Sequence, residues 1–158
     1  MTVTNFELRL RVEDLHARYV HALDSGELER WPEFFTAQGR YRITTAENEA
    51  RGLPIPVLYC EGRPMLRDRI ASLRHANIYE PQRYRHLFSA VLLEEETPGG
   101  VKSIANFLVV RIMENGETTL FASGRYVDRI ALAPEARYEE RVVICDSRAF
   151  DTLLAIPL

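Results

Sequence analysis

The sequence predicts an α+β fold in which N-terminal helices pack on the concave face of a large curved antiparallel sheet. Three long segments alternate apolar and polar residues, as half-buried strands do: residues 103–113, 118–131 and 138–146. Residues 114–117 join the first two segments and contain the Asn115-Gly116 pair, which is favoured in type I′ hairpin turns. Because helical patterns precede a run of consecutive strands, we expect an antiparallel sheet and not a parallel α/β fold.

The chain is predicted to begin with two helices and a strand. After a capping residue at Thr4 or Asn5, apolar side chains recur with helical spacing at Leu8, Val12, Leu15, Tyr19 and Leu23. Asp24-Ser25-Gly26 interrupts this stripe and offers caps for a second helix, which contains Leu28, Trp31, Phe34 and Phe35 and is ended by Gly39. A half-buried strand around Tyr41 and Ile43 follows, because apolar and polar residues alternate there.

A third helix and four consecutive strands complete the predicted fold. Residues 47–56 are polar, contain a glycine and two prolines, and are predicted to form a surface loop before a short strand at 57–60. Pro64 suits the first turn of a helix whose inward positions are Leu66, Ile70 and Leu73. Residues 84–96 supply the first of the four strands, and Gly124 is expected to bend or bulge the third.

The length and charge of the chain exclude several classes of function. At 158 residues, the chain suits a single domain over residues 1–158 with one hydrophobic core. Charged residues make up 27% and the net charge is -3, so no basic field favours nucleic acid or an anionic membrane. No apolar run approaches the roughly 20 residues needed to span a bilayer, and the N-terminus lacks the zones of a signal peptide. We therefore expect a cytoplasmic protein without a nucleic-acid or membrane partner.

The four histidines and two cysteines form no metal-binding motif. His16 and His21 are five residues apart on the first helix, on different faces, and are expected at the surface or at a helix cap. His75 lies near the end of the third helix, where a positive charge is favourable. Cys60 and Cys145 are expected to be buried structural thiols, with a disulfide or a reactive thiol as the less favoured alternatives.

The remaining candidates for chemistry are His86 and three aspartates. His86 begins a strand and points either into the core, as a structural histidine, or towards a partner surface. A carboxylate inside a curved sheet could act as a general base if burial raised its pKa. The commoner roles are structural: Asp24 caps a helix, Asp128 pairs with Arg125 or Arg129, and Asp146 closes a turn. The aromatic residues are expected in the core, although they could line a pocket: Trp31, Phe34, Phe35, Tyr41 and Phe107. No glycine-rich phosphate loop or nucleophile elbow occurs.

Five short motifs follow one another across nearly the whole chain. They are Trp31-Pro32-Glu33-Phe34-Phe35, Asp68-Arg69-Ile70, Tyr84-Arg85-His86, Phe121-Ala122-Ser123-Gly124-Arg125-Tyr126, and the ending from Cys145-Asp146-Ser147 through Asp151-Thr152-Leu153 to Pro157-Leu158. In order and spacing they resemble the small (beta) subunit of aromatic-ring-hydroxylating dioxygenases. The resemblance is closest to oxygenases acting on aromatic acids, especially terephthalate dioxygenase, followed by the salicylate and anthranilate enzymes. It implies a cone-like α+β fold shared with ketosteroid isomerase, nuclear transport factor and SnoaL-like proteins.

The resemblance also implies where the chemistry takes place. In this family a Rieske [2Fe–2S] cluster and a mononuclear iron belong to the large (alpha) subunit. Three small subunits usually assemble with three large ones, and a reductase supplies electrons from NADH. A Rieske centre needs two cysteines and two histidines, and the mononuclear iron needs two histidines and a carboxylate; the sequence shows neither set. We therefore expect a structural subunit with no catalytic, cofactor-binding or metal-binding residue of its own.

The alternative function is a stand-alone isomerase, dehydratase or cyclase on the same fold. Fold alone does not separate the two functions, because function depends on the site that a fold carries. The lack of a convincing inward Asp/His or Asp/Tyr pair in the sequence favours the structural subunit.

The C-terminal segment supplies most of the candidates for contact with the large subunit. Residues after Asp146 are rich in apolar side chains, and large apolar patches commonly mark interfaces. The tail is therefore expected to dock between subunits or to cover the sheet, and the alternative is a tail packed wholly within its own subunit. The expected interface residues are Arg85, His86, Leu153, Leu154, Ile156 and Leu158.

Overall fold

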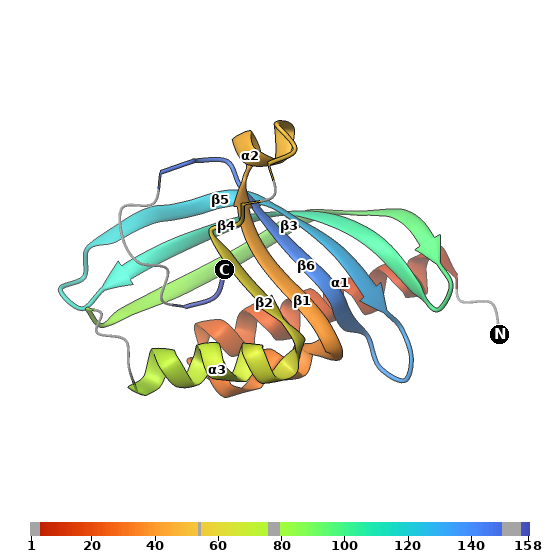
Figure 1. The fold of residues 1–158 in the computed structure, drawn as a ribbon, viewed down its shortest axis with the longest axis horizontal. Coiled ribbons are helices and arrows are strands. Elements are labelled where there is room, and N and C mark those ends of the chain that lie inside the picture. Colours follow the sequence, from red (N-terminus) through yellow and green to blue (C-terminus); the bar gives the residue numbers. More distant parts are fainter. Residues whose placement is uncertain (1–3, 54, 76–79, 150–155) are drawn as a thin grey trace.

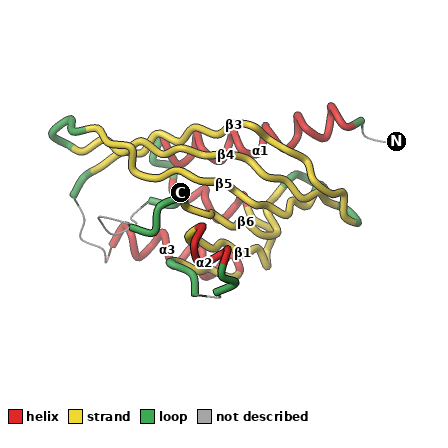
Figure 2. The backbone as a smooth tube through the Cα atoms, turned by 90° about the horizontal axis from the view of Figure 1, so that it is seen from above, coloured by secondary structure: helices red, strands yellow, loops and turns green. Residues whose placement is uncertain are grey.

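A curved six-stranded sheet wraps around two helices in the computed structural model, which describes residues 4–53, 55–75, 80–149 and 156–158 (Figure 1). The strands are β1 (Phe35–Thr45), β2 (Leu58–Glu61), β3 (Gln82–Thr97), β4 (Gly100–Met113), β5 (Thr118–Ala131) and β6 (Arg137–Cys145). The helices are α1 (Asn5–Asp24), α2 (Ala46–Ala50), α3 (Gly62–His75) and the 3-10 helix η1 (Leu28–Phe34). Helix α1 contacts β3 and helix α3 contacts β1, and both cover the same face of the sheet (Figures 1 and 2). The predicted α+β class with helices inside a curved sheet is confirmed.

The sequence pattern predicted an antiparallel sheet, and this prediction is wrong for one pair of strands. Its strand order is β2-β1-β6-β5-β4-β3, and β1 pairs with β6 in parallel while the other neighbours are antiparallel. The reason lies in the connections. Helix α3 carries the chain from β2 at one edge to β3 at the other edge, and three hairpins bring it back until β6 reaches β1. A parallel pair needs such a long connection.

Helix α1 forms as its sequence predicts. The Thr4 side chain accepts a hydrogen bond from the backbone N–H of Glu7 at 3.2 Å, and the Glu7 carboxylate accepts one from the backbone N–H of Thr4 at 2.8 Å. This reciprocal pair is a capping box, which satisfies two N–H groups that the helix itself leaves without partners. The apolar stripe that includes Leu8 and Leu23 is buried against the sheet.

The second predicted helix is wrong in type and in length. Residues 28–34 form a 3-10 helix that contains Pro32, and β1 already begins at Phe35, which pairs with Tyr138. Gly39 therefore lies inside a strand, at a register irregularity between Phe35 and Arg40. A Cβ atom at Gly39 would lie 2.7 Å from the Phe35 Cβ atom and 3.0 Å from the Tyr138 carbonyl oxygen. The glycine permits close strand packing and does not end a helix.

Three local details also differ from the predictions. The expected loop at 47–56 begins with helix α2, because the Thr45 side chain caps it by accepting a bond from the Asn48 N–H at 3.2 Å. The turn after β4 has a positive φ at Gly116 and not at Asn115, so it is not of type I′, which needs both. The β4–β5 register shifts beside Val109, and Gly124 instead lets β6 approach, since a Cβ there would lie 1.9 Å from the Ile144 carbonyl oxygen.

One hydrophobic core fills the space between the sheet and the helices. The aromatic residues expected there are buried: Trp31, Phe34, Phe35, Tyr41 and Phe107. Cys60 and Cys145 are free and buried, and burial raises the pKa of the Cys145 thiol to about 12. Burial raises the pKa of the Cys60 thiol as well, so the expectation of two free, buried thiols is confirmed. None of the described helices is long and apolar enough to cross a membrane.

Candidate functional site

An ion pair lies on the inner face of the sheet, between β5 and β6. Asp128 and Arg141 are cross-strand neighbours, and their side chains are fully buried. The guanidinium donates from Nε to Oδ1 and from Nη2 to Oδ2 of the carboxylate, both at 2.9 Å. The predicted pairing of Asp128 with Arg125 or Arg129 is wrong. Residues at odd spacings along a strand point to opposite faces, so neither arginine side chain reaches the inner face.

Three tyrosine rings surround the guanidinium of Arg141. Its Cζ atom lies 4.4 Å from the ring centroid of Tyr19, 3.8 Å from that of Tyr126 and 4.1 Å from that of Tyr138. Burial disfavours the positive charge, but the Asp128 carboxylate raises the pKa of Arg141 well above its ordinary value. Burial also raises the pKa of Asp128, against the opposing effect of the arginine charge. The pair is held together by two hydrogen bonds and by the faces of the rings.

His16 of α1 completes this cluster from the helix side. Its Nδ1 atom lies 2.7 Å from the Tyr138 hydroxyl and 3.0 Å from Nη2 of Arg141. A guanidinium only donates hydrogen bonds, so Nδ1 accepts and the ring proton is on Nε2. Burial, together with the charge of Arg141, holds the pKa of His16 well below its usual range. His16 is therefore a neutral histidine in the core.

The surface or cap position predicted for His16 is wrong. Val12, His16, Tyr19 and Leu23 follow one another at spacings of four, three and four residues, which places His16 on the buried stripe of α1. His21 is exposed, as predicted. His75 is exposed in the last turn of α3, where its position also agrees with the prediction.

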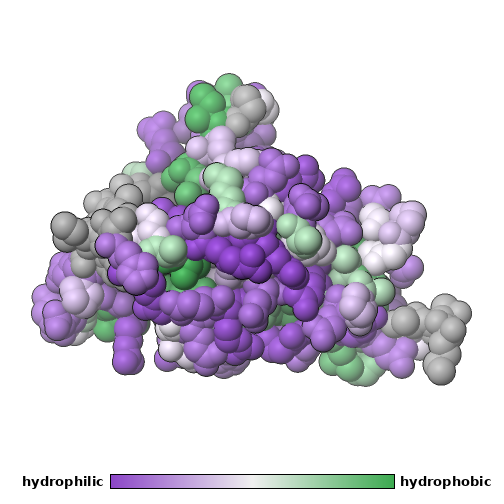
Figure 3. All heavy atoms as spheres, turned by 60° about the horizontal axis from the view of Figure 1, so that its bottom comes forward, coloured by the Kyte–Doolittle hydropathy of each residue, from purple (hydrophilic) through white to green (hydrophobic). Residues whose placement is uncertain are grey.

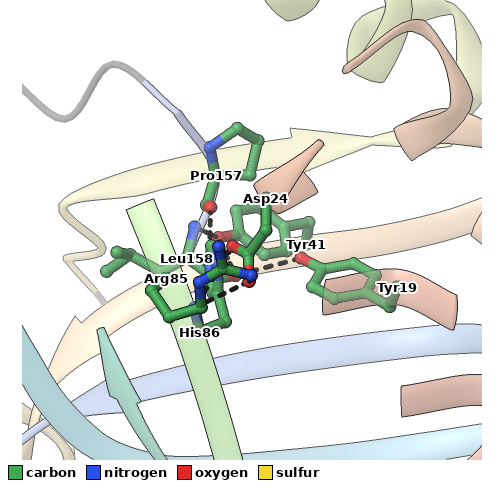
Figure 4. Close-up of polar contacts among 7 residues, drawn as sticks. All are labelled: Tyr19, Asp24, Tyr41, Arg85, His86, Pro157 and Leu158. Carbon is green, nitrogen blue, oxygen red and sulfur yellow. Dashed lines mark hydrogen bonds and ion pairs between the residues drawn. The ribbon is translucent and has the colours of Figure 1, made fainter. Parts of the chain in front are cut away.

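A second buried cluster joins the end of α1 to β3 and to the C-terminal segment, residues 156–158 (Figure 4). Oδ1 of Asp24 lies 2.6 Å from Nδ1 of His86, and the two carboxylate oxygens accept the His86 backbone N–H at 3.2 and 3.0 Å. Nε2 of His86 lies 3.1 Å from the Pro157 carbonyl oxygen. Arg85 is exposed and places Nη1 3.9 Å from Oδ2 of Asp24. Asp24 thus binds a strand across the core and does not cap η1, contrary to the prediction.

The backbone of Leu158 is bound by two tyrosines (Figure 4). Its N–H donates to the Tyr41 hydroxyl at 3.0 Å, and its carbonyl oxygen accepts from Tyr41 at 3.1 Å and from Tyr19 at 3.0 Å. The indole N–H of Trp31 donates to the Tyr19 hydroxyl at 3.0 Å. Leu158 is fully buried and Ile156 is nearly so, both within their own chain. Leu153 and Leu154 lie outside the described residues.

Asp146 was predicted to close a turn, but its hydrogen bonds link β6 to β5. Its backbone N–H donates to the Ser123 carbonyl oxygen at 2.8 Å, and its carboxylate accepts from the Ser123 hydroxyl at 2.9 Å. These bonds hold the end of β6 against β5. Asp146 therefore continues the β5–β6 pairing just beyond the end of β6.

The geometry offers little for catalysis or metal binding. The structure does bring a buried Asp, His and Tyr together, a combination that the sequence did not reveal. However, the side chains of Asp128 and Arg141 are fully buried against each other, and the second Asp–His pair, Asp24 and His86, is closed by the Pro157 carbonyl oxygen, so neither pair is open to a substrate. Among the described residues, no group of three or more His, Cys, Asp or Glu side chains could hold a metal ion. A cavity of about 530 Å³ opens elsewhere, along β4, β5 and residues 147–149, and neither cluster lines it.

Arg141 and its tyrosines are the residues that sequence reasoning missed. In a regular strand, Tyr138 and Arg141 would point to opposite faces because they are three residues apart. The register shifts here, because Arg129 and Ile130 of β5 pair with Glu140 and Tyr138, and the extra residue Glu139 in β6 lets both side chains face the interior. Since this shift leaves no pattern in the sequence, the alternation alone could not identify the site.

Comparisons with known proteins agree with this structural picture. The family described as ring hydroxylating beta subunit matches residues 18–152. The chain is 39% identical to the terephthalate 1,2-dioxygenase terminal oxygenase component subunit beta 1 of Comamonas sp, over 94% of this chain and 97% of that protein. It is 41% identical to the anthranilate 1,2-dioxygenase small subunit of Burkholderia cepacia, over 91% of this chain and 90% of that protein.

Solved structures with the same fold include close and distant neighbours. A crystal structure described as the beta subunit of an aromatic-ring-hydroxylating dioxygenase from Novosphingobium aromaticivorans has a TM-score of 0.86 and 34% identity, covering 94% of this chain and 95% of that one. ActVI-ORFA from Streptomyces coelicolor has a TM-score of 0.65 at 17% identity, covering 88% of this chain and 97% of that one. The second likeness concerns the fold alone. Together they confirm the cone-like α+β fold that was expected.

Proposed function

This chain belongs to the ring hydroxylating beta subunit family. From this premise we propose that it is the structural small subunit of an aromatic-ring-hydroxylating oxygenase. The observation that carries this proposal is the state of the interior of the cone. The carboxylates inside it, Asp128 and Asp24, are bound to Arg141 and His86. Residues that could perform acid–base chemistry are therefore used to hold the fold together.

The proposed substrate of the assembled enzyme is an aromatic carboxylate. Two relatives of similar identity carry the names of terephthalate and anthranilate dioxygenases, and both of these substrates are aromatic acids. Terephthalate or a close analogue is the preferred assignment, with salicylate or anthranilate as further members of the same class. The small subunit would support this reaction without touching the ring.

The proposed partner is a large (alpha) subunit that holds a Rieske [2Fe–2S] cluster and a mononuclear iron, with three copies of each subunit in the complex. The described residues of this chain do not fit either iron group, because no three His, Cys, Asp or Glu side chains among them are placed to hold a metal ion. Its two cysteines lie on β2 and β6, and burial raises the pKa of both thiols, whereas an iron–sulfur cluster needs thiolates. A reductase would supply electrons to the large subunit, and the assembly would act in the cytoplasm.

The proposed contacts with the large subunit include Arg85, which is exposed beside the C-terminal segment, and Leu153 and Leu154. His86, Ile156 and Leu158 are buried in their own chain and would act by fixing the position of that segment. The outer face of the sheet also offers exposed apolar side chains at Leu87, Leu92 and Leu120. The helix side, which is turned forward in Figure 3, is largely hydrophilic by contrast.

Purification of the chain alone and with a co-expressed large subunit tests the proposal. We expect the isolated chain to contain no stoichiometric iron, and the co-expressed subunits to sediment as one species that contains iron. This species, supplied with reductase and NADH, should oxidise terephthalate or a related aromatic acid. About one tightly held iron per isolated chain, or an isomerase, dehydratase or cyclase activity of the isolated chain, would contradict the structural role.

A further inference from the structure

Both ring nitrogens of His86 face oxygen atoms that accept hydrogen bonds. Nε2 lies 3.1 Å from the Pro157 carbonyl oxygen, which only accepts, so this nitrogen carries a proton. Nδ1 lies 2.6 Å from Oδ1 of Asp24. The Asp24 carboxylate also accepts the backbone N–H of His86 and has the Arg85 guanidinium 3.9 Å away, and both contacts favour its ionised form. An ionised carboxylate accepts only, so Nδ1 carries a proton as well.

We propose that His86 is an imidazolium that fastens residues 156–158 inside the cone, so that the cone is a binding site for the C-terminal segment of this same chain. The charge of the ring is matched by Asp24, and the ring donates one hydrogen bond to α1 and one to the C-terminal segment. This inference does not rest on the proposed function, because it uses only contacts within this chain.

The remaining surroundings of the segment agree with a binding site for an apolar peptide. The hydroxyls of Tyr19 and Tyr41 bind the two backbone polar groups of Leu158, and Trp31 completes the chain of donors. The apolar side chain of Leu158 is fully buried in the core. The N–H and the carbonyl oxygen of Leu158 therefore both have hydrogen-bond partners, as buried backbone groups require.

The groups that face His86 decide how protonation affects this binding. Asp24 faces it from α1, Arg85 and Tyr84 lie beside it on β3, and the Tyr84 ring centroid is 6.0 Å from that of His86. Tyr41 of β1 contacts the neighbouring Leu158. When the ring loses a proton, it keeps the Nδ1–H bond to the charged Asp24 carboxylate, which is the stronger acceptor, and loses the Nε2–H bond to the Pro157 carbonyl oxygen. Raising the pH should therefore loosen the segment.

Nitrogen-15 NMR of the full-length chain tests the protonation state. At pH 6 we expect both His86 nitrogens to be protonated, whereas buried His16 carries a single proton, on Nε2. Hydrogen exchange then measures how firmly His86 holds residues 156–158. The protection factor of the Leu158 amide, relative to that of the Val109 amide in the sheet, should fall over the pH range in which His86 loses its proton.

A substitution provides the second arm of the test. His86→Gln should reduce the relative protection of the Leu158 amide by about tenfold or more, the scale expected for a lost charged hydrogen bond. His75→Gln, which replaces an exposed histidine, should leave this protection unchanged. A singly protonated His86 at pH 6, or protection of Leu158 that is unaltered in His86→Gln or as His86 deprotonates, would overturn the proposal. If His86→Gln does not fold, the NMR and exchange measurements on the unaltered chain decide the matter.

Discussion

The two buried histidines of this protein meet opposite surroundings. Nδ1 of His16 faces the guanidinium of Arg141, a donor, and the ring must be neutral. The nitrogens of His86 face a carboxylate and a carbonyl oxygen, which are acceptors. Both rings are almost free of solvent. Burial alone therefore does not decide the charge of a histidine, and the partner atoms at its two nitrogens do.

The difference also separates a permanent from a reversible connection. The cluster of Asp128, Arg141 and His16 contains a guanidinium, which stays protonated at any ordinary pH, so its ion pair is a fixed part of the sheet. The Asp24–His86 cluster depends instead on an imidazole, which can donate through one ring nitrogen or through both. It joins the sheet to residues 156–158, which are otherwise bound through Tyr19 and Tyr41. The first cluster is a support for the fold, and the second is suited to hold a segment.

The largest effect is expected from breaking the fixed ion pair. Asp128→Asn leaves the charge of Arg141 buried without a matching carboxylate, so we expect a loss of about 3–5 kcal/mol in the free energy of unfolding. Urea denaturation measures this loss. Asp14→Asn is a matched control, because Asp14 binds Arg18 at 2.8 Å on the exposed side of α1. That change should alter stability by less than about 0.5 kcal/mol. Similar losses in the two variants would mean that burial of the pair does not matter.

A smaller loss is expected when the C-terminal segment loses one partner. Tyr41→Phe removes the hydroxyl that both accepts from and donates to the Leu158 backbone, and the buried N–H of Leu158 is left without a partner. We expect the free energy of unfolding to fall by about 1–3 kcal/mol, measured by thermal or urea denaturation. Tyr59→Phe is the control, since Tyr59 is partly exposed on β2 and bonds only Glu61 among the described residues. An unaffected Tyr41→Phe variant would show that the segment contributes nothing to stability.

The smallest effect is a pH dependence that arises from His16. Burial and the charge of Arg141 hold the pKa of His16 well below its usual range, whereas in the unfolded chain it titrates near about 6.5. Below that pH the unfolded state binds more protons than the folded state, so stability falls as the pH is lowered. The slope for one proton reaches about 1.4 kcal/mol per pH unit. The slope between pH 6.5 and 5 should be shallower in His16→Gln, and equal slopes in the two proteins would refute this assignment.

Much of the fold follows from periodicity in the sequence, because long elements with one buried face repeat their pattern many times. Helix α1 and strands β4 and β5 are of this kind, and their predicted positions are confirmed. Strand β1 begins at Phe35, earlier than predicted, because its first residues directly follow a 3-10 helix and include the irregularity at Gly39. The parallel pairing of β1 with β6 was missed because strand patterns record which face is buried and not which strand is adjacent.

The buried clusters could be predicted only in part. Asp24, His86 and Asp128 were recognised as candidates from their residue types, but their partners were not. His86 lies 62 positions from Asp24, and Leu158 lies 117 positions from Tyr41. Contacts over such separations depend on how the sheet folds back on itself. Arg141 was missed because the extra residue Glu139 in β6 changes which β6 residues face the interior.

The parallel pairing of β1 with β6 has a consequence for how the chain folds while it is synthesised on the ribosome. Strands β3, β4 and β5 are joined by short turns and can pair as soon as each is made. The β1–β2 hairpin is synthesised earlier but has no neighbour until residues 137–145 emerge, and an isolated two-stranded hairpin is at best marginally stable. The first strand of the sheet to be synthesised therefore waits for the last one to complete its pairing, and until then the N–H and C=O groups along one side of β1 have no strand to pair with.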